Sequence, residues 1–413
     1  MPSWKSEQVL IVGGGIGGLT AALALARQGI ASQLIEQAAA FKEIGAGIQL
    51  GPNVFRMFER LGLIAPISAL AVFPENLIMF DSITGEEVTR IALDDAFRKK
   101  FHYPYALIHR ADLHTVLLEQ CRNSNLIKLD AAEKIVDIDE NNGGITAKTA
   151  SGKAYRGAAL IGADGLWSTI REIVVGDGKP KPAGHITYRA VLPTSEIPEQ
   201  YRRRDMVIWA GEKVHFVLYP LRTGDLYNLV AVFHSNRYEE GWDSYGDPAE
   251  LHERFAQTCA PVRELLAKIE SWRMWVLCDR PPIKDWSRGR ITLLCDAAHP
   301  MLQYLAQGAC MAVEDAVCLA DQAAAADGDY ADAFRAYQAA RYLRTGRVQI
   351  MARVYGEFYH AGGVAKELRN LMLGSRTAED AIAGMEWLYG EQRELAGAGQ
   401  KPLEHAAGTN HRE

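Results

Sequence analysis

Short apolar runs alternate with glycines and helix-forming segments at the start of the chain. Residues 9–12 form an apolar run rich in β-branched side chains, which predicts a buried strand, and residues 19–28 are good helix formers. Residues 31–36 predict a second strand. This order of elements predicts a β-α-β unit with parallel strands.

The middle of the chain has the alternation of apolar and polar residues that is typical of an antiparallel sheet. The pattern covers about 183–280 and is clearest in 214–218 and 228–233. Two further short strands are predicted at 160–162 and 291–294, beside glycine and aspartate motifs. The N-terminal unit is therefore expected to be assembled from pieces that are far apart in the sequence.

Long helices are predicted in the last quarter of the chain. Residues 309–325 are rich in alanine and contain no proline or glycine, and 331–359 continue with a helical pattern. After Tyr389, glycines and a proline stand among charged residues, which predicts a loose tail.

Composition narrows the class of protein. A chain of 413 residues exceeds the usual size of one core, and 48% hydrophobic with 23% charged residues is typical of a globular enzyme. The net charge of -6 and the absence of a basic block argue against a nucleic-acid partner. The sequence contains no run of about 18 apolar residues and no signal peptide, so we expect a cytoplasmic protein without a membrane span.

Cysteine and histidine spacing gives no sign of a disulfide framework or a metal site. The six cysteines contain no C-x-x-C pair, and free thiols in a reducing compartment are expected. The histidines lack ligand spacing such as H-x-x-x-H, so no metal is expected.

Gly13, Gly15 and Gly18 have the G-x-G-x-x-G spacing between the first predicted strand and helix. There the glycines permit a tight turn, a close approach of the backbone to a pyrophosphate, and close packing of helix on strand. The helix N-terminus supplies free N–H groups to the phosphates. Glu36 ends the second predicted strand, where a carboxylate accepts ribose hydroxyls. These residues predict a dinucleotide site but do not distinguish FAD from NAD.

Two later motifs separate these possibilities. Residues 161–171 read Ile-Gly-Ala-Asp-Gly-Leu-Trp-Ser-Thr-Ile-Arg, and residues 294–300 read Leu-Cys-Asp-Ala-Ala-His-Pro. They resemble the DG and GD fingerprints of the single-component, FAD-dependent aromatic hydroxylases of the para-hydroxybenzoate hydroxylase family. The three motifs occur in the family order over essentially the whole chain. Cys295 stands where the family usually has glycine, and a thiol fits there cheaply only if φ is not positive.

The resemblance implies roles in binding a non-covalent FAD. Asp296 is expected to bind the ribityl chain, and the motif that contains Asp164 is expected to serve both FAD and the passing nicotinamide. Arg110 resembles the family arginine that contacts the flavin and its phosphates. The helix that starts at Gly308 and Ala309 would face the flavin and bring its positive end to the reduced ring.

The same resemblance implies an α/β fold with a Rossmann-type, glutathione-reductase-like FAD-binding domain, an inserted antiparallel substrate sheet and C-terminal helices. The expected divisions are an FAD-binding domain over 1–182, from which about 73–97 joins the substrate sheet, a substrate domain over 183–280, a return to the FAD-binding domain over 281–345, and C-terminal helices and tail over 346–413.

Two segments resemble the substrate site of the family. Residues 299–309 are most similar to the branch that hydroxylates 3-hydroxybenzoate at carbon 6, which implies that Gln303 faces the substrate hydroxyl. Residues 213–221 match the family strand whose histidine and tyrosine, here His215 and Tyr219, contact the phenol.

His215 and Tyr219 would share one face of a strand, because side chains alternate with a period of two. In a regular strand they would lie about 13 Å apart, so a bend before Pro220 or a substrate lying between them is required. An imidazole that titrates near neutrality is suited to take the phenol proton.

The implied reaction starts with hydride transfer from NADH to FAD, followed by addition of O2 to give a flavin C4a-hydroperoxide. A small aromatic acid is then hydroxylated, and 3-hydroxybenzoate would give 2,5-dihydroxybenzoate (gentisate). A homodimer is expected from the resemblance alone.

Three alternatives stay open from the sequence. The same chemistry could act on salicylate or 6-hydroxynicotinate. A non-catalytic flavin- or nucleotide-binding sensor could use the fold as a scaffold. A plain NAD dehydrogenase is the weakest alternative, since it gives no role to the motifs of Asp164 and Asp296.

Overall fold

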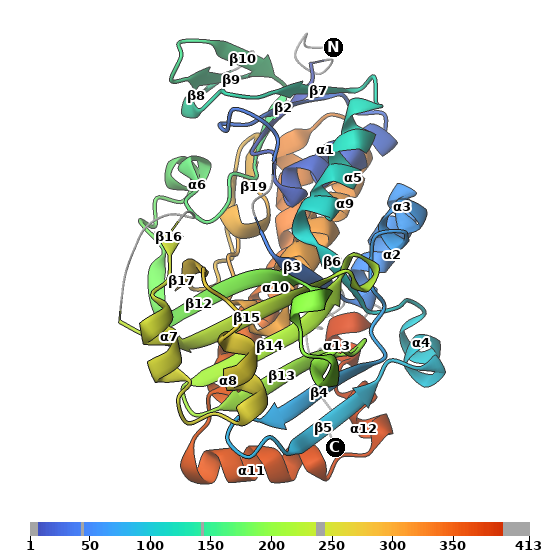
Figure 1. Ribbon diagram of the computed structural model, residues 1–413. Coiled ribbons are helices and arrows are strands. Elements are labelled where there is room, and N and C mark those ends of the chain that lie inside the picture. The colour runs from blue at the N-terminus through green and yellow to red at the C-terminus, as the bar shows by residue number, and fades with distance from the viewer. Residues whose placement is uncertain (1–6, 43–44, 142–143, 237–243, 391–413) are drawn as a thin grey trace, which may run out of the picture.

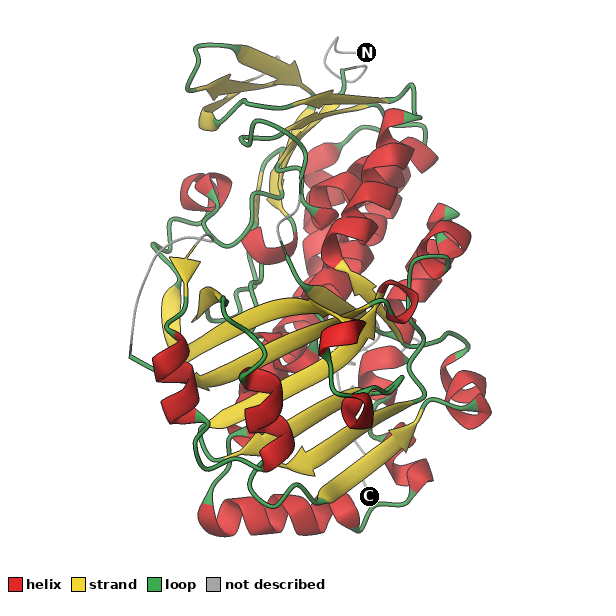
Figure 2. Cartoon of the chain, in the orientation of Figure 1, coloured by secondary structure: helices red, strands yellow, loops and turns green. Residues whose placement is uncertain are grey.

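The structure is a computed structural model that describes residues 7–42, 45–141, 144–236 and 244–390. It has a mixed α/β architecture, in which a parallel sheet and a larger, mostly antiparallel sheet form separate layers (Figure 1). Figure 2 shows that helices gather beside the first sheet and on both sides of the second. The expected mixed α/β class is confirmed.

The helices and strands have the following bounds. The helices are α1 (Ile16–Arg27), α2 (Pro52–Leu61), α3 (Ile64–Ser68), α4 (Asp95–Phe101), α5 (Arg110–Arg122), α6 (Thr169–Val174), α7 (Pro248–Arg254), α8 (Ala260–Leu266), α9 (Gly308–Ala325), α10 (Tyr330–Tyr359), α11 (Gly363–Gly374), α12 (Ala378–Ala383) and α13 (Glu386–Tyr389). The strands are β1 (Val9–Val12), β2 (Ser32–Ile35), β3 (Gly47–Leu50), β4 (Asn76–Asp81), β5 (Glu87–Ala92), β6 (Ala106–His109), β7 (Ile127–Asp130), β8 (Ile135–Asn141), β9 (Gly144–Thr149), β10 (Ala154–Gly157), β11 (Ala159–Gly162), β12 (Lys181–Pro193), β13 (Met206–Gly211), β14 (Val214–Leu221), β15 (Leu226–His234), β16 (Ser244–Tyr245), β17 (Arg273–Asp279), β18 (Ser287–Arg288) and β19 (Ile291–Leu293).

The first sheet has the strand order β18-β19-β11-β1-β2-β7, and only its β18 edge is antiparallel. The residues of β1, β2 and β11 are buried throughout. This explains why β1 and β11 are continuous apolar runs in place of an alternating pattern, whereas β2 begins with the buried polar residues Ser32 and Gln33. Strands from residues 9, 159 and 291 onward become neighbours, so this sheet is assembled from distant segments.

The glycine turn after β1 is shaped by close backbone contacts. Gly13 has φ +109°, and a Cβ there would lie 2.3 Å from the carbonyl oxygen of Ala163. A Cβ on Gly18 would lie 1.9 Å from the carbonyl oxygen of Gly13. Any larger residue at either position would push α1 away from the sheet.

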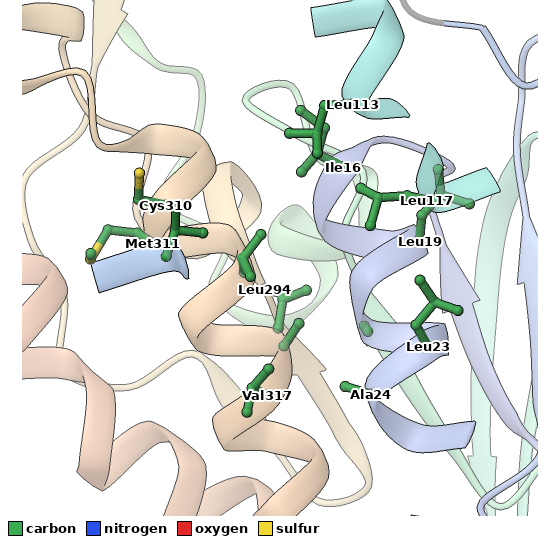
Figure 3. Close-up of a cluster of buried hydrophobic side chains, with 14 of the residues drawn as sticks. Ile16, Leu19, Leu23, Ala24, Leu113, Leu117, Leu294, Cys310, Met311 and Val317 are labelled. Atoms are coloured by element: carbon green, nitrogen blue, oxygen red, sulfur yellow. The ribbon is translucent and has the colours of Figure 1, made fainter. Parts of the chain in front are cut away.

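Helix α1 packs against α9 and α5 in the interior beside this sheet. Figure 3 shows Ala24 of α1 on the side toward Val317 of α9, and Leu19 on the other side of α1, beside Leu117 of α5. All of these residues are buried. The many alanines of α9 bring the two helix axes close together, and this close packing fixes where the N-terminus of α9 lies.

The second sheet has the order β16-β17-β12-β15-β14-β13-β4-β5 and is antiparallel except between β13 and β4. Helices α7 and α8 cover one face, and they bury Leu251, Phe255 and Leu265 against it (Figure 1). Pro220 lies beyond the end of β13, which pairs only as far as Leu218 of β14, so its missing N–H interrupts no ladder on that side.

Two of the expected domain divisions fall inside regular elements. The division at 182/183 lies within β12, and the division at 345/346 lies within the continuous helix α10. The loose tail predicted after Tyr389 lies, from residue 391 onward, outside the described residues. None of the helices in the described ranges combines the length and apolar character needed to cross a bilayer.

A buried charge network joins α9 to α10. Asp315 accepts hydrogen bonds from Arg341 Nε at 2.6 Å and lies 2.5 Å from His299 Nε2. Glu314 lies 3.1 Å from Arg344, whose guanidinium also donates to the carbonyl oxygens of Trp387 and Leu388. Burial alone would raise the pKa of Glu314, but Arg344 and Arg341 lower it to about 2.

We predict that this network makes stability fall at acid pH. The pKa of Glu314 in the folded chain, about 2, lies below its ordinary value of 4.5, so its contribution is complete above pH 4.5 and is lost as the pH falls toward 2. A shift of this size corresponds to about 3 kcal/mol. The urea midpoint of Glu314→Gln should lie well below that of the original chain at pH 7, and the gap should narrow between pH 5 and pH 3.

The exposed pair of Asp332 and Arg335 supplies the control, since its side chains are 60% and 67% exposed. Asp332→Asn should shift the free energy of unfolding by less than about 1 kcal/mol at every pH. A gap for Glu314→Gln that is equally wide at pH 7 and pH 3 would contradict the assignment.

Candidate active site

A cavity of about 440 Å³ lies between the glycine turn, the start of α9 and one face of the second sheet. Many residues that the sequence predicted for the site share this cavity. The predicted residues in its lining are Gly15, Arg110, His215, Tyr219, Cys295, Asp296, Gln303, Gly308 and Ala309.

Four other predicted residues, Gly13, Gly18, Glu36 and Asp164, are not in the lining of the cavity. Glu36 accepts hydrogen bonds from the N–H of Gly14 at 2.6 Å and of Ala38 at 2.7 Å, so it holds the glycine turn. Asp164 accepts hydrogen bonds from Ser168 Oγ and the N–H of Ile170, and burial raises its pKa. Both carboxylates therefore accept hydrogen bonds from backbone N–H groups, and Asp164 also accepts one from a side chain four residues away.

The DG and GD motifs contact each other through Arg171. Its side chain is 1% exposed, and Nη1 donates to the carbonyl oxygens of Ala297 and Ala298 at 2.8 and 2.7 Å. Asp177 neutralises the guanidinium at 2.6 Å. Arg171 ends the first motif in the sequence, but only the fold reveals that it fixes the loop that carries Asp296.

Cys295 occupies a left-handed backbone position, with φ +57°. The position therefore has the conformation in which glycine is cheapest, and the thiol is accommodated at a cost of about 1–3 kcal/mol. Its sulfur lies directly against the glycine turn, because a Cβ on Gly17 would be 2.0 Å from Cys295 Sγ. Burial raises the pKa of the thiol, so it stays protonated and is a poor nucleophile.

His215 and Tyr219 project from β14 on the same face as Val217, and all three line the cavity. The pairing of β14 with β15 runs from Val214 to Leu221 without a register shift. The bend considered before Pro220 is therefore absent, and the cavity spans the distance between the two side chains.

Tyr219 is packed against the backbone of the opposite wall. A Cβ on Gly47 would lie 2.5 Å from the Tyr219 ring, and the N–H of Gly47 donates to Asn228 at 2.8 Å. Gln49 lies beside the Tyr219 hydroxyl and accepts a hydrogen bond from Tyr105. Burial raises the pKa of Tyr219, so its hydroxyl can donate a hydrogen bond at neutral pH.

The expectation that His215 titrates near neutrality is wrong for this structure. Burial, helped by His185, lowers its pKa to about 3. The imidazole is neutral at pH 7, and its Nδ1 is hydrogen-bonded to His360 Nε2 at 2.7 Å. Its ring also lies 5.6 Å from that of Tyr304, centroid to centroid. His215 is therefore held in place by neighbours that the sequence reading did not identify.

Arg189 is a site residue that sequence reasoning missed. It lies on β12, lines the cavity and donates a hydrogen bond to Gln303 Oε1. Its buried Nε has no hydrogen-bond partner among the described residues. Burial lowers its pKa, and the charge of Arg110 lowers it further, so an anion in the cavity would meet two cations. The signal in the sequence was an arginine flanked on both sides by apolar and hydroxyl residues, at 186–188 and 190–193.

An aromatic wall was also missed. Tyrosines from four different elements line the cavity, together with Trp387 of α13. They are Tyr105, Tyr304, Tyr355, Tyr359 and Tyr389. No periodic pattern links these positions, because helices α10 and α13 reach the cavity only through tertiary packing.

The lining fits FAD. Backbone N–H groups are available where the glycine turn and the N-terminus of α9 reach the cavity at Gly15 and Gly308, and a Cβ on Gly308 would meet open space. Arg110 adds a positive charge and Asp296 a carboxylate to the same wall. This combination suits a dinucleotide with phosphates at one end and hydroxyl groups beyond them.

Comparison with known proteins identifies the family. Residues 6–348 match the FAD binding domain family. A 3-hydroxybenzoate 6-hydroxylase of Polaromonas naphthalenivorans (strain CJ2) is 44% identical over 382 residues, which cover 92% of this chain and 95% of that protein. The 3-hydroxybenzoate 6-hydroxylase 1 of Aquipseudomonas alcaligenes is 42% identical over 387 residues, or 94% and 98% of the two chains.

A solved structure agrees. Klebsiella pneumoniae HpxO complexed with FAD and uric acid has a TM-score of 0.81 and 26% identity, and the match covers 93% of this chain and 97% of that one. The predicted family resemblance is thereby confirmed. The chain belongs to the FAD binding domain family, and it is an FAD-dependent aromatic monooxygenase.

Proposed function

We propose that this enzyme hydroxylates 3-hydroxybenzoate to 2,5-dihydroxybenzoate (gentisate), with NADH as reductant and O2 as the source of the oxygen atom. The observation that carries the proposal is a cavity that places the guanidinium of Arg189 in one lining with His215 and Tyr219. A phenolic acid offers one anionic and one hydroxyl group to such a lining. The names of the two relatives at 44% and 42% identity support the same substrate.

The finer description of the fold belongs to this proposal. The sheet centred on β1 and the helices α1 and α9 would form the Rossmann-type FAD-binding domain, and the sheet from β12 to β5 the inserted substrate domain. We keep the division near 280, place the first division before β12 rather than at 182, and place the last division after α10 rather than at 345. The homodimer and the cytoplasmic location stay predictions from the sequence.

We assign FAD binding to the residues around the glycine turn and the GD motif. The backbone at Gly13, Gly15 and Gly18 would admit the pyrophosphate, with Arg110 as its cation, and Asp296 would accept hydroxyl hydrogens of the ribityl chain. Glu36 would exchange its bond to Gly14 for a ribose hydroxyl, and Asp164 would act through the turn that it stabilises. When bound and reduced by the nicotinamide, FAD activates O2 for transfer to the ring.

Arg189 would bind the carboxylate of the substrate. Its Nε has no hydrogen-bond partner in the part of the chain that the structure describes, and a buried cation gains most from an anion in a site that excludes water. Gln303 accepts from Arg189 and donates to Thr187 Oγ1 at 3.4 Å. Gln303 would therefore orient Arg189 as well as face the substrate hydroxyl.

His215 and Tyr219 would hold the phenol. The neutral imidazole of His215 can accept the hydrogen bond of the phenol hydroxyl, and the protonated Tyr219 can donate to its oxygen. As the phenol loses its proton, the developing negative charge stabilises positive charge on His215. The electron density of a phenolate at its ortho and para carbons favours attack on the activated oxygen.

Substrate turnover tests the proposal. With purified protein, NADH oxidation coupled to product should be at least about tenfold more efficient, in kcat/KM, for 3-hydroxybenzoate than for salicylate or 6-hydroxynicotinate. Benzoate, which lacks the hydroxyl, should not be hydroxylated. The product should be 2,5-dihydroxybenzoate by chromatography. A different dihydroxybenzoate, or a preference for either alternative acid, would overturn the proposed substrate.

Charge removal tests Arg189. Arg189→Gln should raise KM for 3-hydroxybenzoate by about 10- to 100-fold, which is the worth of a charge-assisted hydrogen bond. The uncharged analogue 3-hydroxybenzamide should lose less than about threefold, because it presents no anion. The control is Arg204→Gln at an exposed position. An equal loss for the acid and the amide would exclude Arg189 as the carboxylate partner.

Replacement of His215 tests phenol activation. His215→Ala should slow the hydroxylation step by about 10²- to 10⁴-fold at pH 7 and leave the FAD content unchanged. His215→Gln keeps a hydrogen-bond acceptor but cannot take a proton, so it should be almost equally slow. The defect should shrink as rising pH ionises the phenol directly. Rapid mixing of the reduced, substrate-bound enzyme with O2 measures the step, and a rate within about twofold of the original would leave His215 a structural role only.

A further inference from the structure

Three histidines from separate elements converge beside the cavity. His185 on β12 and His234 at the end of β15 are direct partners in the sheet register, and their ring centroids lie 4.3 Å apart. His360 follows the last turn of α10, with its centroid 5.1 Å from that of His185 and 4.9 Å from that of His234. One nitrogen of each ring lies within 4.8 Å of the other two.

The outer nitrogens of two of these rings are already held. The hydroxyl of Tyr304 lies 2.6 Å from His185 Nδ1, and His215 Nδ1 lies 2.7 Å from His360 Nε2. The inner contact joins His360 Nδ1 to His234 Nε2 at 2.9 Å. Metal-binding histidines almost always carry such a hydrogen bond on the nitrogen that faces away from the metal, where it fixes the ring and its tautomer.

The protonation state of the three rings favours coordination over repulsion. Burial lowers the pKa of His185 to about 4, and it lowers the pKa values of His234 and His360 as well. The rings are neutral at pH 7, so a lone pair is available without displacing a proton.

The surrounding charges are mixed. Glu357 raises the pKa of His234, so a negative charge lies close enough to favour a cation. The positive charge of Lys213 lowers the pKa of His234, and the positive charge of Arg369 lowers the pKa of His360. The guanidinium of Arg369 is directed to Asn370 Oδ1 and to the carbonyl oxygens of Phe358 and Tyr359. One carboxylate and two cations therefore lie near the cluster, so the affinity for a divalent ion would come from the three imidazoles themselves.

We propose that His185, His234 and His360 form a binding site for one divalent transition-metal ion of the zinc type. Three imidazoles without carboxylate or thiolate suit Zn²⁺, Co²⁺, Ni²⁺ or Cu²⁺ rather than Mg²⁺ or Ca²⁺, and leave a fourth position for water. Zinc–nitrogen bonds of about 2.0–2.1 Å place the ligand nitrogens roughly 3.4 Å apart. The nitrogens of His234 and His360, which are 2.9 Å apart, must therefore separate slightly, and the nitrogen of His185, within 4.8 Å of both, must move inward. His234 is half-buried at the rim and can make the first of these movements.

Metal binding would change the hydrogen bonding of residues that line the cavity. Coordination replaces the hydrogen bond between His360 and His234, while the outer bonds of the other nitrogens lead to His215 and Tyr304, which both line the cavity. With the ion on His360 Nδ1, the proton of that ring lies on Nε2 and is donated to His215 Nδ1, so the neutral His215 carries its own proton on Nε2. The ion would thus turn Nε2 of His215 from an acceptor into a donor without contacting the substrate, and so remove the acceptor that phenol activation uses.

The test uses the untagged, FAD-loaded protein after treatment with a chelator. Calorimetric titration with Zn²⁺ should give one site per chain with a Kd of about 10 µM or tighter. Co²⁺ should give absorption bands at wavelengths longer than those of the flavin. Zn²⁺ should also raise the thermal unfolding midpoint, because it binds the folded chain in preference to the unfolded one.

Variants locate the site. His234→Ala should weaken Zn²⁺ binding more than tenfold and abolish the thermal stabilisation, and Tyr304→Phe should weaken it by about 10- to 100-fold through the lost outer bond. His252→Ala, at an exposed position on α7, should bind Zn²⁺ as the original chain does. The flavin content reports whether each variant is folded. Of the three histidines, His234 is the least buried, so its replacement by alanine should disturb the core least.

Two results would overturn the proposal. The first is the absence of saturable Zn²⁺ binding tighter than about 1 mM in the original chain. The second is binding of equal affinity in His234→Ala, which would assign the ion to another part of the surface.

Discussion

The buried ion pairs between α9 and α10 determine how the helices on one side of the cavity are positioned. Glu314 and Asp315 cannot be buried without Arg341 and Arg344, and Arg344 in turn holds the backbone of α13. Because an unpaired buried charge costs several kcal/mol, the helices cannot shift separately. The start of α9, the His299 loop and the wall formed by α13 are therefore positioned as one unit around the cavity.

The opposite wall is positioned by hydrogen bonds between strands. The register of β12, β15 and β14 sets Arg189, His215 and Tyr219 at fixed spacings, and a slip of one residue would turn all three away from the cavity. Arg171, at the end of the DG motif, holds the loop of the GD motif by hydrogen bonds to its backbone carbonyl oxygens. The cavity is thus bounded by a sheet and a group of helices, each held in place by its own buried interactions.

Local patterns were enough to predict the glycine turn, the long helices and the shared face of His215 and Tyr219, because each depends on residues close together in the chain. Arg189, the tyrosine wall and the partners of Glu314 could not be predicted in this way. Their neighbours are chosen by sheet order and helix packing over separations such as 114 residues between Arg189 and Gln303. The same reason explains why histidine spacing predicted no cluster: His185 and His234 become partners only through the register of two strands.

The side chain of Cys295 limits which residues can stand at position 17. The sulfur occupies the space where a side chain at position 17 would begin, and the left-handed backbone at position 295 admits glycine without strain. A side chain at position 17 needs the sulfur of Cys295 to be moved or removed, whereas a change at 295 does not require one at 17. The two positions are therefore coupled, and the effects of substitutions at one of them will not add to those at the other.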